Sequence, residues 1–169
     1  MARLLLALFV LFASVASVAT AYADDEKKDA AKESKMKTLA VHRTIAKYEG
    51  APYRLCRGRT ARCPRECGDS GEFATFKIVD YLEYKKPGKY GDPKQTQFRF
   101  QISDFNRKPK GDPQLTKIAA DLQEGDLVLL EWRHLYGEVQ PGLISPTRPV
   151  SKLKKLTEEE AKALRQPGK

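Results

Sequence analysis

The chain has 169 residues, three cysteines and a formal net charge of +9 at pH 7. Its length allows one domain with a buried core, and beyond the N-terminal segment no stretch is apolar enough for a membrane-spanning helix. The basic excess favours anionic partners such as acidic glycans, anionic lipids or phosphorylated ligands. Ordinary solubility charge is an equal explanation, because the lysines are scattered along the whole chain.

The first residues have the pattern of an export signal. Arg3 precedes an uncharged apolar run from Leu4 to Ala19, and the residues 21–23 (Ala-Tyr-Ala) fit a small-x-small cleavage site. We therefore predict a Sec signal peptide at residues 1–23 and export to the periplasm or the extracellular space, with retention as an uncleaved anchor as the alternative. Residues 24–37 are charged and contain almost no large apolar side chain, which indicates a flexible spacer.

Five segments after the spacer have the pattern of strands. Residues 38–48 are partly alternating, although helical spacing competes there, and residues 72–86 and 95–105 alternate on either side of a turn, which predicts a hairpin. The other two strands are expected at 127–136 and, with lysines along an edge, at 150–156. Alternation along residues 72–86 places Tyr81 on the exposed face of its strand. Alternation along residues 95–105 likewise places Arg99 on the exposed face of the next strand.

Helical signals occur twice. Apolar residues at helical spacing predict a short amphipathic helix over 113–122, and Thr157 with Glu160 fits a capping box that opens a helical tail at 157–169. The segment 137–149 contains three prolines and is predicted to be a loop. We expect residues 38–156 to form one domain that is mainly β with one internal helix.

This element order resembles the OB-fold, a five-stranded, partly open barrel with its helix between the third and fourth strands. The resemblance covers residues 38–156 and rests on the order of elements and on the helix–Gly–Asp–apolar strand join at 113–136. It implies an OB-fold-like five-stranded barrel. It also implies a ligand surface on the second and third strands, flanked by the loop around residues 53–73 and the loop 137–149.

The segment 53–73, YRLCRGRTARCPRECGDSGEF, is here named the Cys/Arg loop, and it holds all three cysteines. A disulfide between two of them with one free thiol is the preferred interpretation, and thiol-redox chemistry is another. The third is a metal site, in which Cys56, Cys63 and Cys67 bind zinc or copper and His134 is the fourth ligand. His42 is the other candidate for that fourth position.

The same loop contains five arginines, and guanidinium groups bind phosphate, sulfate and carboxylate in a bidentate manner. We therefore predict a non-enzymatic binding module without a cofactor, which engages an anionic ligand or a protein partner. Nucleic acid is not expected as a native partner because the chain is expected to be exported. The candidate ligand-binding residues are Arg54, Arg57, Arg59, Arg62, Arg65, Tyr81 and Arg99.

The loop also contains Gly-Asp-Ser-Gly at residues 68–71, which is similar to the nucleophile turn of chymotrypsin-like serine proteases. In that family a second glycine and a proline follow, whereas here the next residues are Glu72 and Phe73. Too few residues precede Ser70 to build the barrel that carries the family's histidine and aspartate. We therefore interpret this segment as a polar turn that leads into a strand.

Overall fold

A computed structural model describes residues 36–58 and 60–166, so the predicted signal peptide, nearly all of the predicted spacer and Arg59 lie outside the described residues. Within those ranges no helix is both long enough and apolar enough to span a bilayer. The strands are β1 (Met36–Tyr48), β2 (Tyr53–Arg54), β3 (Gly71–Lys85), β4 (Gln97–Gln101), β5 (Leu127–Gln140), β6 (Leu143–Thr147) and β7 (Val150–Leu156). The helices are α2 (Pro113–Ala120) and α3 (Glu158–Arg165).

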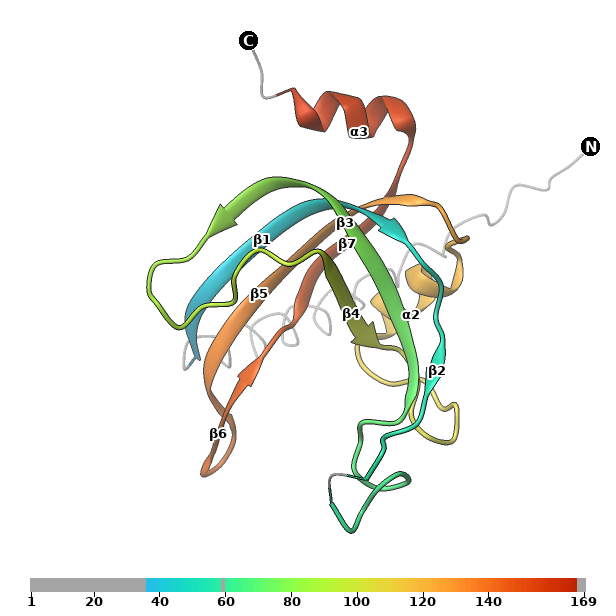
Figure 1. Cartoon of the computed structure of the whole chain (residues 1–169), viewed down its shortest axis with the longest axis vertical. Helices are drawn as coiled ribbons and strands as arrows, with labels where there is room; N and C mark the ends of the chain where they lie inside the picture. The colour runs from blue at the N-terminus through green and yellow to red at the C-terminus, as the bar shows by residue number, and fades with distance from the viewer. Residues whose placement is uncertain (1–35, 59, 167–169) are drawn as a thin grey trace, which may run out of the picture. The chain divides into compact units, whose positions relative to one another are not determined.

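The seven strands form one antiparallel sheet in the order β2-β3-β1-β5-β6, with β4 pairing to β3 and β7 pairing to β5 (Figure 1). β1 hydrogen-bonds to β3 on one side and β5 on the other, which excludes the competing helical interpretation of residues 38–48. The predicted hairpin of 72–86 with 95–105 is also confirmed, because β4 pairs with β3 from Phe73 to Lys77. The chain is therefore mainly β, as its alternating pattern predicts.

The sheet is open, so the predicted five-stranded barrel is wrong. In the described chain β4 pairs with β3 alone and β7 pairs with β5 alone, and no ladder joins β4 to β7. Ala119 of α2 and the following Leu122 instead pack into the same core as Phe98 of β4 and Leu153 of β7. Side-chain packing by the helix thus takes the place of the backbone pairing that closure would require.

The segment 137–149 is a second correction, because it is a β-hairpin and not a loop. β5 continues to Gln140, the turn contains Gly142 with a positive φ of 76°, and β6 pairs back onto β5. Pro146 lies in β6, which is an edge strand of the sheet. An edge strand tolerates proline because the missing N–H would otherwise face away from its partner strand.

Two register shifts between β1 and β3 decide which β3 side chains face inward. Opposite β1, the pairing skips Val79 and Leu82, so each is the extra residue of a β-bulge. Ile78 packs against the core. The bulge at Val79 reverses the alternation, so Tyr81, three residues after Ile78, packs against the same core. Tyr81 is therefore half-buried, and its hydroxyl accepts a hydrogen bond from the backbone N–H of Gln95 at 2.7 Å. The prediction that Tyr81 lies on the exposed face of its strand is wrong for this reason, and its proposed role in ligand binding stays a prediction.

Apolar side chains pack on both faces of the sheet. One cluster gathers inward-facing residues of β1, β3, β4 and β5 around the fully buried Trp132 and Phe76. The other cluster, which includes Ile45 and Leu129, packs against Ala161 and Leu164 of α3. The capping box that the sequence predicts at the start of α3 is present. This predicted tail helix therefore packs on the sheet.

Candidate metal centre in the Cys/Arg loop

The base of the Cys/Arg loop is fixed to the sheet where β2 meets β3 (Figure 1). Tyr53 and Arg54 pair with Glu72 and Gly71, so the residues between them form an excursion beyond this pairing. Gly71 has a φ of 143°, and a Cβ on it would lie 2.0 Å from the carbonyl oxygen of Ser103. Only glycine fits at this position, because a side chain would overlap the backbone of Ser103. The base of the loop therefore lies directly against the segment after β4.

Ser70 connects the two arms of the loop. Its side-chain oxygen accepts a hydrogen bond from the backbone N–H of Cys56 at 2.9 Å and donates one to the carbonyl of Pro64 at 2.6 Å. The residue is only 1% exposed, so both bonds form away from solvent. The serine of the Gly-Asp-Ser-Gly segment therefore positions Cys56 beside the turn that carries the other two cysteines.

The second arm of the loop is tied to β4. The side-chain amide of Gln101 donates to the carbonyl of Ser70 at 2.8 Å. The ammonium group of Lys110 donates to the carbonyl of Gly68 and to the side-chain oxygen of Gln101, each at 2.8 Å. Gln101, which alternation places on an open face, thus serves as an anchor for the loop.

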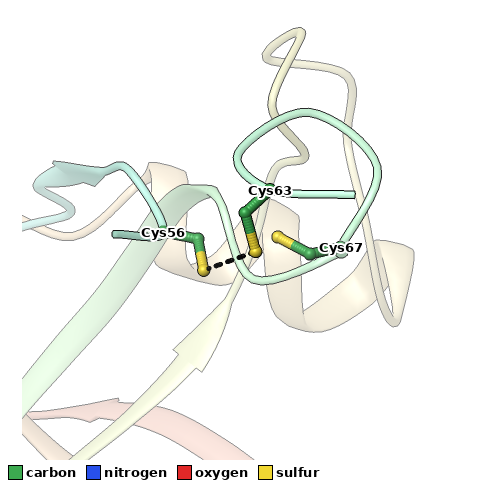
Figure 2. A group of neighbouring side chains, drawn as sticks. All are labelled: Cys56, Cys63 and Cys67. Atoms are coloured by element: carbon green, nitrogen blue, oxygen red, sulfur yellow. Dashed lines mark hydrogen bonds between the residues drawn. The ribbon is translucent and has the colours of Figure 1, made fainter. Parts of the chain in front are cut away.

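The three cysteines converge at the centre of the loop. Figure 2 shows their sulfurs turned toward one another, and all three Sγ atoms lie within 4.8 Å of each other. The Sγ atoms of Cys56 and Cys63 are 3.2 Å apart, and Thr60 Oγ1 lies 3.5 Å from the sulfur of Cys63. All three cysteines are partly exposed and none is in a disulfide. The sulfurs therefore surround one point that an ion from solvent can reach.

The sulfur atoms influence one another's ionisation. The hydroxyl of Thr60 and then the thiol of Cys56 hydrogen-bond to the sulfur of Cys63 and lower its pKa to about 6. At Cys67 a hydrogen bond from the backbone of Asp69 lowers the pKa, but partial desolvation and the other two sulfurs outweigh it, and the net shift is upward. One thiol thus ionises readily while the site resists a second negative charge.

His134 does not lie with the cysteines, so its prediction as the fourth ligand is not supported by the geometry. It pairs with Ala40 of β1, whereas the loop starts beyond Tyr48 at the other end of that strand, roughly 25 Å along it. Its Nδ1 accepts a hydrogen bond from the backbone N–H of Asp92 at 3.1 Å. Among the described residues, the three cysteines form a potential metal-binding group without any histidine or carboxylate.

His42 is also remote from the loop and lies in the core. Its ring stacks on Trp132 with centroids 4.4 Å apart, and its Nδ1 lies 3.4 Å from the hydroxyl of Tyr81. Burial lowers the pKa of His42 to about 4, because the charged ring would be removed from water. We call His42, Trp132, His134 and Asp92 the histidine cluster; both of its histidines are buried, and the Nε2 atom of each has no hydrogen-bond partner among the described residues.

The predicted arginines divide into three groups. Arg54, Arg57 and Arg99 line one cavity of about 380 Å³ beside Cys56. The guanidinium of Arg65 instead lies over the ring of Phe105, 5.8 Å from its centroid. Arg62 is exposed and lines neither that cavity nor the adjoining one, and Arg59 lies outside the described residues.

Sequence reasoning missed two kinds of residue at this site. Leu55 and Phe73 line the same cavity as the arginines. The only sequence signal for this is that two apolar residues lie beside charged residues in a loop. Ser70 and Gln101 anchor the loop through contacts that cross long stretches of chain, and no local pattern signals them.

The chain matches no protein-family model, and no match was found among curated proteins or solved structures.

Proposed function

We propose that this chain is an exported, non-enzymatic binding module whose Cys/Arg loop binds one Cu(I) ion through Cys56, Cys63 and Cys67. The observation that carries the proposal is the approach of three cysteine sulfurs to within 4.8 Å of one another. Three thiolates around a metal with bonds of about 2.3 Å stand about 4 Å apart, so little movement is needed to bind an ion.

The number and kind of ligands favour Cu(I) over zinc. Thiolates are soft ligands that select Cu(I), zinc and iron–sulfur clusters. Structural zinc is almost always bound by four ligands, whereas the group that the described residues form here consists of three sulfurs without a histidine or carboxylate. Cu(I) is satisfied by a trigonal set of three thiolates, which is the set that the loop presents.

A single disulfide with a free thiol explains the geometry less well. A disulfide needs two sulfurs in bonding contact, and the third cysteine could then point anywhere. The third sulfur instead lies beside the other two (Figure 2). The sulfurs of Cys56 and Cys63 help to raise the pKa of Cys67. A bound cation offsets this effect, because the metal replaces the thiol protons.

The arginines of the loop complement a thiolate-bound ion. Three thiolates with one Cu(I) carry a net double negative charge, which neighbouring cations stabilise. Arg57, Arg62 and Arg65 flank the cysteines in sequence, and no carboxylate in the described chain forms an ion pair with them. Their charge is therefore free to offset that of the bound site.

The test is a titration of the reduced full chain with Cu(I) in competition with a chromophoric chelator, without oxygen. We expect one Cu(I) per chain. Serine in place of any one cysteine lowers the affinity by about 100-fold or more, since one of only three ligands is lost. Arg62→Ala is the comparison variant. It removes one neighbouring positive charge and leaves every sulfur in place, so its loss of Cu(I) affinity should be much smaller than that of any cysteine variant.

Two results contradict the proposal. One is equal Cu(I) affinity in the wild-type chain and in a variant with all three cysteines replaced by serine. The other is zinc binding at least as tight as that of Cu(I), which would require a fourth ligand and would replace Cu(I) as the bound ion. Circular dichroism of every variant verifies that the sheet is intact.

A further inference from the structure

The cavity beside Cys56 has a charge pattern that differs from the rest of the described domain. Arg43, Arg107, Arg148 and Arg165 each form an ion pair with a carboxylate elsewhere on the domain. In contrast, Arg54, Arg57 and Arg99, which line the cavity, form no ion pair with any described carboxylate. Three guanidinium groups without an ion pair are thus gathered on one hollow, whereas Arg62 and Arg65, which also form none with a described carboxylate, lie outside it.

The positions of these arginines follow from the fold. Arg54 lies in β2 and pairs with Gly71, while Arg99 lies in β4 and pairs with Thr75, so both extend from strands that flank β3. Arg57 comes from the loop, whose first arm Ser70 holds at Cys56. Rigid elements therefore supply two of the three cations, which limits the entropy lost when a ligand binds.

The cavity also has an apolar side. The ring of Phe73 lies under the guanidinium of Arg99, 5.7 Å from centroid to Cζ, and Leu55 is 58% exposed at the same cavity. Asp69 is its one acidic residue. A volume of about 380 Å³ lies within the usual range for small-molecule sites, about 300 to 1,000 Å³.

We propose that this cavity binds a small organic anion, that is, an oxyanion group carried on an aromatic or aliphatic body. The guanidinium groups of Arg54, Arg57 and Arg99 hold the oxyanion through charge-assisted hydrogen bonds. Leu55 and Phe73 hold the apolar body. Carboxylates, phosphate esters and sulfate esters share this chemistry. The site does not depend on a metal, although Cys56 forms part of its wall.

The experiment follows amide chemical shifts of the isotope-labelled full chain during titration with phenyl phosphate, phenyl sulfate and benzoate at constant ionic strength. Inorganic phosphate and phenol are titrated as the two halves of the ligand. We expect saturable shifts at Leu55, Phe73 and Arg99 with at least one of the three organic anions. Each half alone should bind at least about tenfold more weakly, because it lacks either the oxyanion or the apolar contact.

Variants separate this site from diffuse charge and from the cysteines. Arg99→Gln should weaken binding of the organic anion about tenfold, whereas Arg62→Gln, on the same loop but outside the cavity, should not change it. Cys67→Ser removes a proposed copper ligand that does not line the cavity, and it should also leave anion binding unchanged. Failure of copper binding would thus leave this proposal standing, and the reverse also holds.

Three outcomes overturn the proposal. The first is the absence of saturable shifts with all three organic anions. The second is an equal loss of binding in Arg99→Gln and Arg62→Gln, which would indicate attraction by the overall charge of the loop. The third is equal binding of inorganic phosphate and phenyl phosphate, which would show that Leu55 and Phe73 do not contact the ligand.

Discussion

In the Cys/Arg loop three potential metal ligands converge at the surface, whereas in the histidine cluster two potential ligands lie inside the core. The sulfurs of Cys56, Cys63 and Cys67 meet beyond the pairing of β2 with β3 and are partly exposed. His42 is fully buried against Trp132, and His134 is 5% exposed and bonded to Asp92. Both regions contain chemically active side chains, but only the loop presents several of them to one solvent-accessible point.

This difference shows how partners decide the role of a side chain. Asp92 accepts two hydrogen bonds from Arg148, at 2.6 and 2.9 Å, and donates its backbone N–H to His134. These bonds tie the segment between β3 and β4 to β5 and to the turn between β6 and β7. The sulfurs of the cysteines instead contact one another, Thr60 and the carbonyl of Pro64, and no ion pair or buried ring of the described chain holds them.

The largest expected effect tests whether the two regions are separate. Cys63→Ser should lower Cu(I) affinity by about 100-fold or more, whereas His134→Gln should leave it within about twofold of the wild-type value. Competition titration with a chelator measures both variants. A large loss of Cu(I) affinity in His134→Gln would restore this histidine as a ligand and would contradict the separation.

The second prediction concerns the histidine cluster and pH. The pKa of His42 is about 4 in the folded protein against 6.5 for the free side chain, so the unfolded chain binds this proton first as the pH falls. The free energy of unfolding should therefore decrease from pH 6.5 to pH 4, by on the order of 3 kcal/mol from this group. The pKa of His134 is also lowered by burial and acts in the same direction.

Urea unfolding at several pH values measures this dependence, and His42→Gln is the comparison because glutamine does not titrate. The variant should show a smaller loss of stability in acid than the wild-type chain. Identical pH dependence in the two proteins would contradict the assignment to His42. The charged and titratable groups around it, which stay in place in both proteins, are Tyr81, Tyr84, Asp92, His134 and Arg148.

The third prediction tests how the loop is held. Ser70→Ala removes the acceptor for the N–H of Cys56 and the donor to Pro64 while all three sulfurs remain. Cu(I) affinity should fall by about ten- to hundredfold, as for other residues that orient metal ligands. Ser151→Ala on β7 is the control. Unchanged affinity in Ser70→Ala would mean that the loop arranges its cysteines without this anchor.

The smallest expected effect concerns the scaffold alone. Thr157→Ala removes the hydroxyl that accepts a hydrogen bond from the backbone N–H of Glu160 at the start of α3. The free energy of unfolding should decrease by about 1 kcal/mol, and Cu(I) affinity should not change. Chemical denaturation and the copper titration measure the two quantities. A parallel loss of copper binding would indicate that α3 influences the loop.

Local patterns predicted most of the elements. Alternation placed β1, β3, β4 and β5, helical spacing placed α2, and the capping box placed the start of α3. The bulges at Val79 and Leu82 depend on pairing with β1 and have no local signature, so the inward direction of Tyr81 could not be predicted. The open edges of the sheet could not be predicted for a similar reason, because closure of a barrel depends on pairing between distant strands.

The candidate site was predictable to the same extent. Three cysteines within twelve residues of one loop are close enough in sequence to meet, and they do. His134 is separated from them by the length of β1, which only the strand register could reveal. Arg54, Arg57 and Arg99 meet because β2 and β4 both flank β3, whereas Arg65 is drawn to Phe105.

The most direct test of the copper proposal is native mass spectrometry of the chain, expressed in a cell and recovered from it without added metal. Thiol alkylation before and after a Cu(I) chelator accompanies it. We predict a chain with one copper ion, whose three cysteines react only after the chelator has removed the metal. A metal-free chain that is two hydrogens lighter than the reduced form and has one reactive thiol would contradict the proposal.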